Sequence, residues 1–382
     1  MFMPHNLNVV PGAAKRYKWP QRIRKTFAAL VTVLLLCPVM PRASLATEKI
    51  GDLNADGRVN AADAAVLLRS MDFQDECDMA LMDISANGRV DEVDARILLS
   101  FACGGIPSLA GFGESLQNGL CDEKYFDRFC YTGVSAVSGA YYRDDIVSVD
   151  ISCMAFDKTV GSRERKVTCY IAEIFLKDIS YFKTALSSDA FHGKYESVLD
   201  IAARHNAIVA ISGDFYNSSL HKGPVNRNGT WYRSEVGGPL DVCALLYDGT
   251  LITMPAGTYT SDMLLALEPY QLWCFGPSLI EADGTVPTSY NSDVTEEHPR
   301  AAIGSDGPGH YFFVLVDGRR PQYSSGLNMT GLSELFIELG CTVAYNLDGG
   351  QTAVMATKDA LISVPISKEG RPVSDILYIA MP

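Results

Sequence analysis

The sequence predicts an α+β protein, in which a small all-α module precedes a larger domain built on a mixed sheet. Three observations predict this fold class. An acidic, glycine-containing loop followed by a helical pattern occurs twice within residues 48–105, and strand-like apolar runs alternate with helical patterns from residue 121 onward. The composition, 47% hydrophobic and 20% charged over 382 residues, is that of a globular chain with more than one domain.

Residues 1–46 have the order of parts of a secretory signal peptide. They contain seven basic residues and no acidic residue, an apolar run over residues 27–40, and small residues near the end. The apolar run is shorter than the ~20 residues that a membrane-spanning helix needs. We therefore expect a secreted protein that meets the membrane only through its export signal, with cleavage after Ala46. A retained membrane anchor is the alternative.

The chain after this signal is strongly acidic. The whole sequence has a formal net charge of −13, but the part beyond residue 46 carries 25 basic and 45 acidic residues. Binding to phosphate backbones needs a clustered basic surface. The charge balance therefore excludes nucleic acid as the main partner.

Nine cysteines follow the signal, and oxidising conditions outside the cell would allow them to form disulfides. An odd number cannot all pair internally. Nearness in the sequence suggests Cys77 with Cys103 and Cys121 with Cys130, and unpaired buried thiols are the alternative. Since there is no CxxC motif and the six histidines lack metal-binding spacing, the sequence does not predict a zinc site.

Two twelve-residue loops within residues 48–105 have the ligand pattern of calcium sites. Each has side-chain oxygens at loop positions 1, 3, 5, 9 and 12 and glycine at position 6, and the backbone carbonyl at position 7 completes the set. Calcium prefers roughly six to eight oxygen ligands. The second loop has Ser85 and Asn87 at positions 3 and 5 and no acid at either, so we expect it to bind calcium more weakly. The predicted ligands are Asp52, Asn54, Asp56, Arg58, Asn60, Asp63, Asp83, Ser85, Asn87, Arg89, Asp91 and Asp94.

Each loop runs into a predicted helix, at residues 61–71 and 92–101. This duplicated loop-helix unit, residues 48–105, resembles a type I dockerin, a small EF-hand-like module that attaches enzymes to cohesin domains. The resemblance implies two bound Ca²⁺ ions and a cohesin partner on a scaffold or cell-surface protein. In that family the partner is selected around loop positions 10 and 11, which here are Ala61, Ala62, Glu92 and Val93.

Residues 106–134 are the predicted linker and lead-in segment, because glycine and proline recur in their first part. We expect the second domain to span residues 135–382, which is long enough to bury a full core. The expected strands lie at residues 167–176, 207–211, 242–247, 311–316, 342–345 and 376–381, and the expected helices at residues 195–205 and 330–339.

Polar, glycine-rich corners border several of these strands, and sites are usually built at such corners. Asp-Gly is also a common turn sequence, so a turn is the alternative role of Asp317. Pairing with an internal acid is the alternative to substrate contact for Arg300. The four corners are Gly213-Asp214, Arg300-Ala301, Asp317-Gly318-Arg319 and Asn346-Leu347-Asp348-Gly349-Gly350.

In this order, the corners resemble the phosphodiester glycosidase family over residues 165–382, and most of all its bacterial, exopolysaccharide-related branch. The family includes the enzyme that uncovers mannose 6-phosphate by removing a capping N-acetylglucosamine. The sequence departs from the family pattern at two places: Ser212 replaces Asn, and the segment Gln351-Thr352-Ala353 replaces Gly-Ser-Ser. The resemblance implies hydrolysis of sugar 1-phosphodiesters in extracellular or cell-wall polysaccharide, with no cofactor known for this domain.

The chemistry of this reaction assigns roles to the corner residues. The phosphate needs cationic, bidentate recognition, for which Arg300 and Arg319 are suited. A carboxylate must stabilise the oxocarbenium-like centre or activate water, and Asp348 and Asp214 are the candidates. Asp317 and Glu173 are further catalytic candidates. The expected substrate-binding residues are Asn346, Gly349, Gly350, Gly213 and Arg227.

A second function is compatible with the same residues. A non-catalytic module on the same scaffold could bind glycans or wall phosphate polymers through this pocket. Arg227 could lie at the edge of this pocket. The alternative is that it belongs to a hairpin loop, because the next two residues, Asn228-Gly229, are a turn sequence. Turnover of a sugar 1-phosphodiester distinguishes an enzyme from a binding module.

Overall fold

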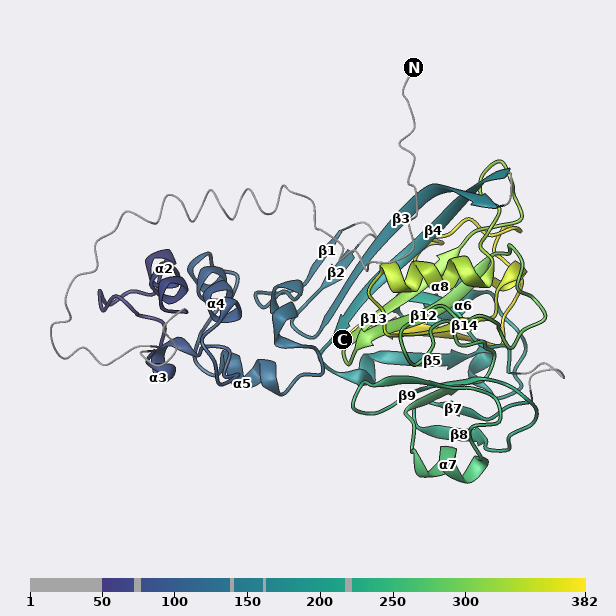
Figure 1. The fold of residues 1–382 in the computed structure, drawn as a ribbon, viewed down its shortest axis with the longest axis horizontal. Coiled ribbons are helices and arrows are strands. Elements are labelled where there is room, and N and C mark those ends of the chain that lie inside the picture. The colour runs from purple at the N-terminus through teal and green to yellow at the C-terminus, as the bar shows by residue number, and fades with distance from the viewer. Residues whose placement is uncertain (1–49, 72–76, 138–140, 161–162, 217–221) are drawn as a thin grey trace, which may run out of the picture. The chain divides into compact units, whose positions relative to one another are not determined.

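A computed structural model describes residues 50–71, 77–137, 141–160, 163–216 and 222–382. The predicted signal peptide, residues 1–46, lies outside these ranges. Within them, no helix is both long and apolar enough to cross a membrane. The α+β fold class is confirmed, because helices dominate the first part of the described chain and antiparallel sheets the second (Figure 1).

Each predicted calcium loop precedes a helix, α2 (Ala61–Ser70) or α4 (Glu92–Ala102), and the short α3 (Met79–Met82) lies between them. Both long helices begin with a capping box. At α2, the Asn60 side chain accepts a backbone N–H of the first turn, and the Asp63 side chain accepts the Asn60 N–H. The second repeat has the same arrangement. Leu67 of α2 and Leu98 of α4 are buried in one core.

Residues 106–134, predicted as linker and lead-in segment, contain helix α5 (Phe112–Gln117) and the 3₁₀ helix η2 (Glu123–Arg128). Phe112, Leu116 and Phe126 are buried in the core that α2 and α4 share. This segment is therefore not an extended spacer, although it contains several glycines. Its apolar side chains are buried in a core, which holds it in place.

The structure has no disulfide among its described residues, so neither suggested cysteine pair is formed. Cys121 is buried against Phe129 and Phe175, whereas Cys130 lies 3.8 Å from the Thr132 hydroxyl. The alternative expectation of buried thiols agrees with Cys243, which is fully buried in the sheet core.

A seven-stranded sheet forms the centre of the second domain, and all neighbouring strands are antiparallel. Strand β2 pairs with residues 148–150 of β3, and in the described part of the chain the remainder of β3 has a strand neighbour on one side only, β4. The spatial order is β1 (Ser135–Val137), β2 (Tyr141–Arg143), β3 (Val147–Val160), β4 (Arg163–Leu176), β13 (His310–Val316), β12 (Arg300–Gly307) and β14 (Val343–Leu347).

Two smaller antiparallel sheets complete the domain. The four-stranded sheet has the order β15 (Met355–Ala356), β6 (Ala207–Ser212), β16 (Asp375–Ala380) and β5 (Phe182–Leu186). The five-stranded sheet has the order β10 (Leu251–Met254), β9 (Val242–Leu245), β11 (Gln271–Trp273), β7 (Val225–Arg227) and β8 (Thr230–Arg233).

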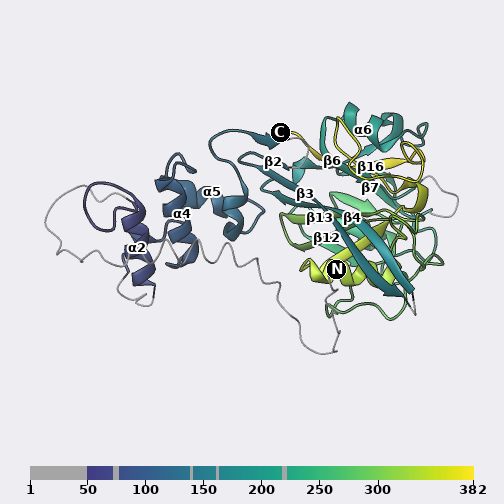
Figure 2. The same cartoon turned by 90° about the horizontal axis from the view of Figure 1, so that it is seen from above.

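The main core contains buried side chains from all three sheets. Helix α8 (Met329–Glu338) packs on the seven-stranded sheet through a second cluster, in which Phe336 contacts Gly304 of β12 (Figure 1). Helix α6 (Val198–Arg204) lies beside β6 and β16 (Figure 2). Helix α7 (Ser261–Ala266) and the 3₁₀ turns Ile179–Tyr181, Ser187–Asp189 and Gly350–Thr352 complete the elements.

Candidate functional site

The ends of β14 and β6 meet at Asp348, and their contact joins the seven-stranded sheet to the four-stranded sheet. The Asp348 N–H donates to the Gly213 carbonyl (2.9 Å), and the Ser212 hydroxyl donates to the Asp348 carbonyl (3.1 Å). Ser212 ends β6, and Asp348 follows the last residue of β14. Two sheets therefore hold the backbone that carries the Asp348 carboxylate, which fixes its direction.

The Asp348 carboxylate is mostly buried, with 11% of the side chain exposed. Arg371 approaches it to 3.7 Å (Nη2 to Oδ2). Burial raises the pKa of Asp348 to about 6, although a hydrogen bond from Thr352 and the charge of Arg371 lower it. A carboxylate with this pKa is ionised at neutral pH and basic enough to accept a proton from water.

Asp214 is sealed beneath the site in an ion triad with Arg227 and Asp375. Arg227 Nη2 lies 2.8 Å from Asp214 Oδ1 and 2.9 Å from Asp375 Oδ2. The other Asp214 oxygen accepts the Cys274 N–H (3.1 Å). Because the three side chains are at most 1% exposed, the predicted catalytic role of Asp214 and substrate contact of Arg227 do not fit their placement.

Asp375 is a member of this triad that the sequence did not single out. It is the first residue of β16, and its carboxylate also accepts the Asp214 N–H (3.0 Å). A Cβ atom at Gly213 would lie 2.1 Å from Asp375 Oδ1, so glycine is required for this close approach. The sequence feature that could have identified Asp375 is an acidic residue at the start of an otherwise apolar strand.

Arg300 begins β12, and its guanidinium is buried without an acidic partner among the described residues. The side chain is bound to backbone carbonyls instead: Nε donates to Leu327 (3.0 Å), and Nη2 donates to Val294 (3.0 Å) and Glu296 (2.6 Å). Burial, followed by the charge of Arg319, lowers the pKa of Arg300 to about 10. The alternative considered for Arg300, pairing with an internal acid, is therefore not found among the described residues.

Arg319 lies three residues beyond the end of β13 and is exposed. Its backbone φ is +57°, a conformation that is strained for a residue other than glycine. A Cβ atom at Gly350 would lie 3.3 Å from Arg319 Nη2, so the guanidinium rests against the glycine turn that follows Asp348. The structure thus brings Arg319 and the Gly349-Gly350 turn together, as the sequence predicted.

The Gly349-Gly350 turn is packed tightly against Pro299. The Gly350 N–H donates to the Pro299 carbonyl (2.9 Å), and a Cβ atom at Gly349 would lie 2.6 Å from the same oxygen. Asn346, a predicted substrate ligand, donates from Nδ2 to the Gly276 carbonyl (2.8 Å). Its Oδ1 is buried and has no hydrogen-bond partner in the described part of the chain.

His298 is a neighbour of these arginines that the sequence did not single out. Its Nδ1 accepts the Nε–H of Arg319 (3.3 Å). Burial, and then the charges of Arg319 and Arg300, lower the pKa of His298. The sequence signal for His298 was its position two residues before Arg300, at the border of a corner already considered.

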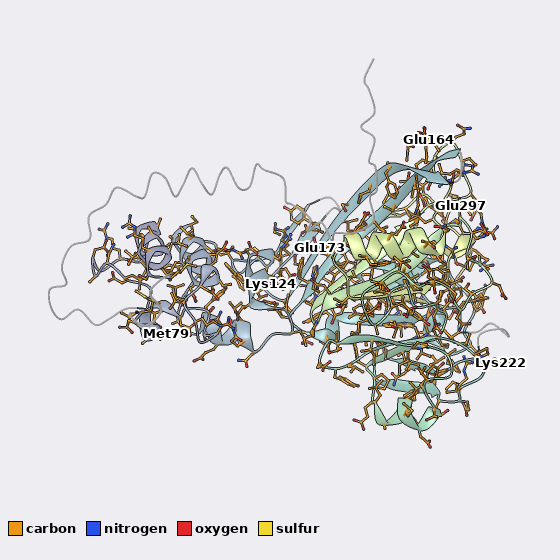
Figure 3. The ribbon with its side chains drawn as sticks, viewed as in Figure 1. Met79, Lys124, Glu164, Glu173, Lys222 and Glu297 are labelled. Atoms are coloured by element: carbon orange, nitrogen blue, oxygen red, sulfur yellow. The ribbon has the colours of Figure 1, made fainter. Side chains whose placement is uncertain are left out.

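Asp317 and Glu173 are bound to other partners. Asp317 is buried and accepts the Tyr323 hydroxyl (2.9 Å) and the Val364 N–H (3.1 Å), which anchors two loops. Glu173 of β4 lies 3.2 Å from His310. Glu173 and Glu297, the residue before His298, lie in separate parts of the domain (Figure 3). The structure therefore leaves Glu173 outside the cluster around Asp348.

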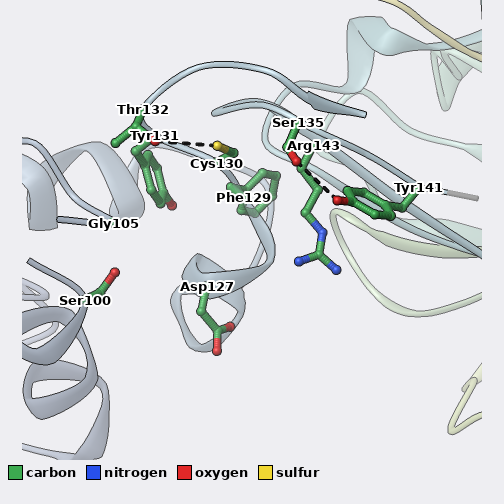
Figure 4. Close-up of a pocket in the computed structure, with 10 residues that line it drawn as sticks. All are labelled: Ser100, Gly105, Asp127, Phe129, Cys130, Tyr131, Thr132, Ser135, Tyr141 and Arg143. Carbon is green, nitrogen blue, oxygen red and sulfur yellow. Dashed lines mark hydrogen bonds between the residues drawn. The ribbon is translucent and has the colours of Figure 1, made fainter. Parts of the chain in front are cut away.

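A pocket of about 530 Å³ lies apart from this cluster, and no predicted site residue of the second domain lines it. Ser100 of α4, Asp127 of the lead-in segment and Arg143 of β2 are among its lining residues (Figure 4). The charged groups already have partners, because Asp127 pairs with Arg96 and Arg143 pairs with Asp150.

The two predicted calcium loops follow the same backbone course. Both have positive φ at positions 4 and 6, with Gly57 at +85° and Gly88 at +81°. Their all-oxygen donor set fits calcium. In the structure the position-12 carboxylates, Asp63 and Asp94, accept backbone N–H groups. No three His, Cys, Asp or Glu side chains of the described chain gather in a metal-binding arrangement.

Comparison with known proteins agrees with both predicted resemblances. Residues 205–380 match the family model described as phosphodiester glycosidase, and residues 50–100 match the model of the dockerin type I domain. Residues 205–380 are thus similar to the phosphodiester glycosidases, and they follow a segment similar to the dockerin type I domain, here called the dockerin domain.

Two individual proteins are similar over long stretches. The chain is 26% identical over 280 residues to the SPbeta prophage-derived uncharacterized protein YomE of Bacillus subtilis, and the match covers 70% of this chain but only 41% of that protein. The fold resembles that of the zebrafish N-acetylglucosamine-1-phosphodiester alpha-N-acetylglucosaminidase catalytic domain, auto-inhibited by its pro-peptide. That match has a TM-score of 0.52 and 21% identity, and it covers 61% of this chain and 84% of the other.

Proposed function

We propose that this protein is a secreted hydrolase of sugar 1-phosphodiester linkages in extracellular or cell-wall polysaccharide, attached to a cohesin scaffold through its dockerin domain. The observation that carries the enzymatic part is the setting of Asp348. Its carboxylate is fixed by two sheets and followed by a glycine turn that contacts Arg319. A general base such as Asp348, with the positively charged Arg319 nearby, suits a substrate that carries a negatively charged phosphate.

In the proposed reaction, water attacks the anomeric carbon and the bond from that carbon to the phosphate oxygen breaks. The phosphate monoester leaves with the bonding electron pair, and Asp348 accepts a proton from the attacking water. A phosphate monoester is already a good leaving group, so a second carboxylate acting as acid is less needed than in ordinary glycoside hydrolysis. This agrees with a site beneath which Asp214 and Asp375 are sealed.

Replacement of the candidate base tests the proposal. Asp348→Asn should lower kcat by about 10²-fold or more on a sugar 1-phosphodiester, since loss of a general base typically has an effect of this size. Asp359→Asn, an exposed aspartate of the same domain, is the matched control and should keep full activity. Undiminished hydrolysis by Asp348→Asn would show that the base lies elsewhere.

The dockerin domain supports the second part of the proposal, binding of two Ca²⁺ ions and of a cohesin domain. Calorimetric titration with calcium should show two binding events, of which Asp52→Ala and Asp83→Ala each remove one. Capture of the protein by a cohesin should then require calcium. Capture that persists in a chelator, with all calcium removed, would contradict the metal-dependent attachment.

A non-catalytic glycan-binding module is the second candidate function. It is favoured by the departure at Gln351-Thr352-Ala353, which places Thr352 beside Asp348 with its hydroxyl donating to the Gly349 carbonyl (2.6 Å). A module of this kind would bind phosphate-containing glycans without converting them. Screening a panel of sugar 1-phosphodiesters for both binding and turnover separates the two functions.

A further inference from the structure

The two arginines of the site, Arg300 and Arg319, carry positive charges that no acidic side chain of the described chain neutralises. The charge of Arg319 lowers the pKa of Arg300, yet neither arginine has an acidic partner within ion-pair distance in the described chain. The Nη1 group of Arg300 and both Nη groups of Arg319 make no hydrogen bond to described residues. Two unneutralised guanidinium groups with free N–H donors favour a bound anion.

The hydrogen bond from Arg319 to His298 fixes how the remaining donors of Arg319 are presented. Nε is bonded to His298 Nδ1, which leaves the two Nη groups as a planar pair on the far side of the guanidinium. His298 is itself held by two backbone hydrogen bonds with Leu327, at 3.2 and 3.1 Å. An arginine side chain that would otherwise sample many rotamers is thus anchored to the chain segment that also carries Arg300.

The tautomer of His298 follows from this contact. Because Nδ1 accepts a hydrogen bond, the ring must be neutral with its proton on Nε2. Burial and the two arginines lower the pKa of His298, which keeps the ring neutral at pH 7. Glu296 and Glu297 oppose this shift but do not outweigh it.

We propose that His298 is a positioning residue, which orients the Arg319 guanidinium to bind, together with Arg300, the phosphoryl group of the substrate. This inference rests on the proposed hydrolysis of sugar phosphodiesters and adds a residue to that site. His298 acts through Arg319, and not by transferring a proton to the leaving group.

Binding of inorganic phosphate by the full chain, measured by calorimetry, tests the role apart from turnover. His298→Ala should weaken phosphate binding about tenfold, since it removes the acceptor that orients a charge-assisted contact. His298→Asn offers an amide oxygen close to the position of Nδ1 and should restore most of the affinity. Lys368→Ala, which removes an exposed positive charge of the same domain, is the control and should bind as the wild type does.

A double-mutant cycle separates positioning from a general structural role. Arg319→Lys keeps the charge but lacks the Nε donor, so adding His298→Ala to it should cause no further loss. In kinetics, His298→Ala should raise KM for a sugar 1-phosphodiester about tenfold and change kcat less, as expected when binding of substrate and transition state is lost equally.

The outcomes distinguish this inference from the proposed function. Phosphate binding that depends on His298, in a protein that turns over no sugar 1-phosphodiester, would support the positioning role and contradict the hydrolase. Turnover with phosphate affinity unchanged in His298→Ala would overturn the positioning role and leave the hydrolase intact. Failure of His298→Asn to recover affinity, or additive losses in the cycle, would also overturn it.

Discussion

At the scale of single residues, Asp348 and Asp214 show how surroundings decide the role of one residue type. Both follow an apolar strand and stand beside glycine. Asp348 keeps a partly exposed carboxylate, whereas Asp214 is enclosed by Arg227 and a backbone amide. The partner that distinguishes Asp214 from Asp348 is Arg227, which comes from a different strand, β7, and the local sequence pattern does not contain that information.

The pH dependence of the proposed reaction follows from Asp348. Activity should rise with pH through about 6, because only the ionised carboxylate accepts a proton. Arg371→Ala removes a charge that lowers this pKa, so the rising limb of kcat/KM should move to higher pH. Arg371→Lys keeps the charge and should stay nearer the wild type. A limb that does not move in Arg371→Ala would argue against this coupling.

The buried triad should determine stability and not catalysis directly. Arg227→Met leaves two sealed carboxylates without a cation and should lower the free energy of unfolding by about 3–5 kcal/mol. Asp375→Asn leaves one carboxylate opposite one guanidinium and should cost less. Denaturant unfolding measures both, with the exposed Lys368→Met as control. An equal loss in the two variants would show that charge balance is not the cause.

The same triad predicts a pH dependence of stability. Burial raises the pKa of Asp375 in the folded state, so the folded protein holds a proton that the unfolded chain has released. Its contribution to stability is present below the ordinary carboxyl pKa and is lost as pH rises through the raised value. Asp375→Asn should therefore flatten the decline of unfolding free energy between about pH 4 and pH 7.

Part of the candidate site could be predicted from the sequence. Asp348, Arg300, Arg319 and the glycine turn come together because the start of β12 and the ends of β13 and β14 meet at one edge of an antiparallel sheet. His298 and Asp375 were missed. Their functions depend on contacts with Arg319 and Arg227, which no spacing rule connects.

At the scale of elements, strands with apolar runs were easier to predict than strands with small residues. The expected runs at residues 207–211 and 311–316 agree with β6 and β13. Strand β12 was missed because Ala301, Ala302 and Gly304 give little strand signal. Those small residues are needed, since a Cβ atom at Gly304 would lie 2.6 Å from the Phe336 ring of α8.

The N-cap side chains of α2 and α4 should contribute to the stability of the dockerin domain independently of metal binding. In a chelator, Asp91→Ala should lower the stability of the dockerin domain by about 1 kcal/mol, because the N-cap side chain no longer accepts the Val93 N–H. Glu92→Ala, one residue further and exposed, is the matched control. Circular dichroism at increasing denaturant measures both, and equal effects would contradict the cap.

At the scale of the whole molecule, the helical core around α2 and α4 and the main sheet core have no residue in common. Heating should therefore produce two transitions in calorimetry, and calcium should raise only that of the dockerin domain, because a ligand stabilises the unit that binds it. Asp52→Ala combined with Asp83→Ala should abolish the shift. One transition that moves as a whole with calcium would show that the two cores unfold together.

The long strand β3 has a consequence for how the protein behaves in concentrated solution. Beyond residue 150 it pairs with β4 alone among the described residues, so within that part of the chain a row of backbone N–H and C=O groups has no strand on the other side. Such an edge can recruit the same edge of another molecule. Within residues 151–160 the only charged side chains are Asp157 and Lys158. Resistance to self-association along this edge therefore depends on these two charges.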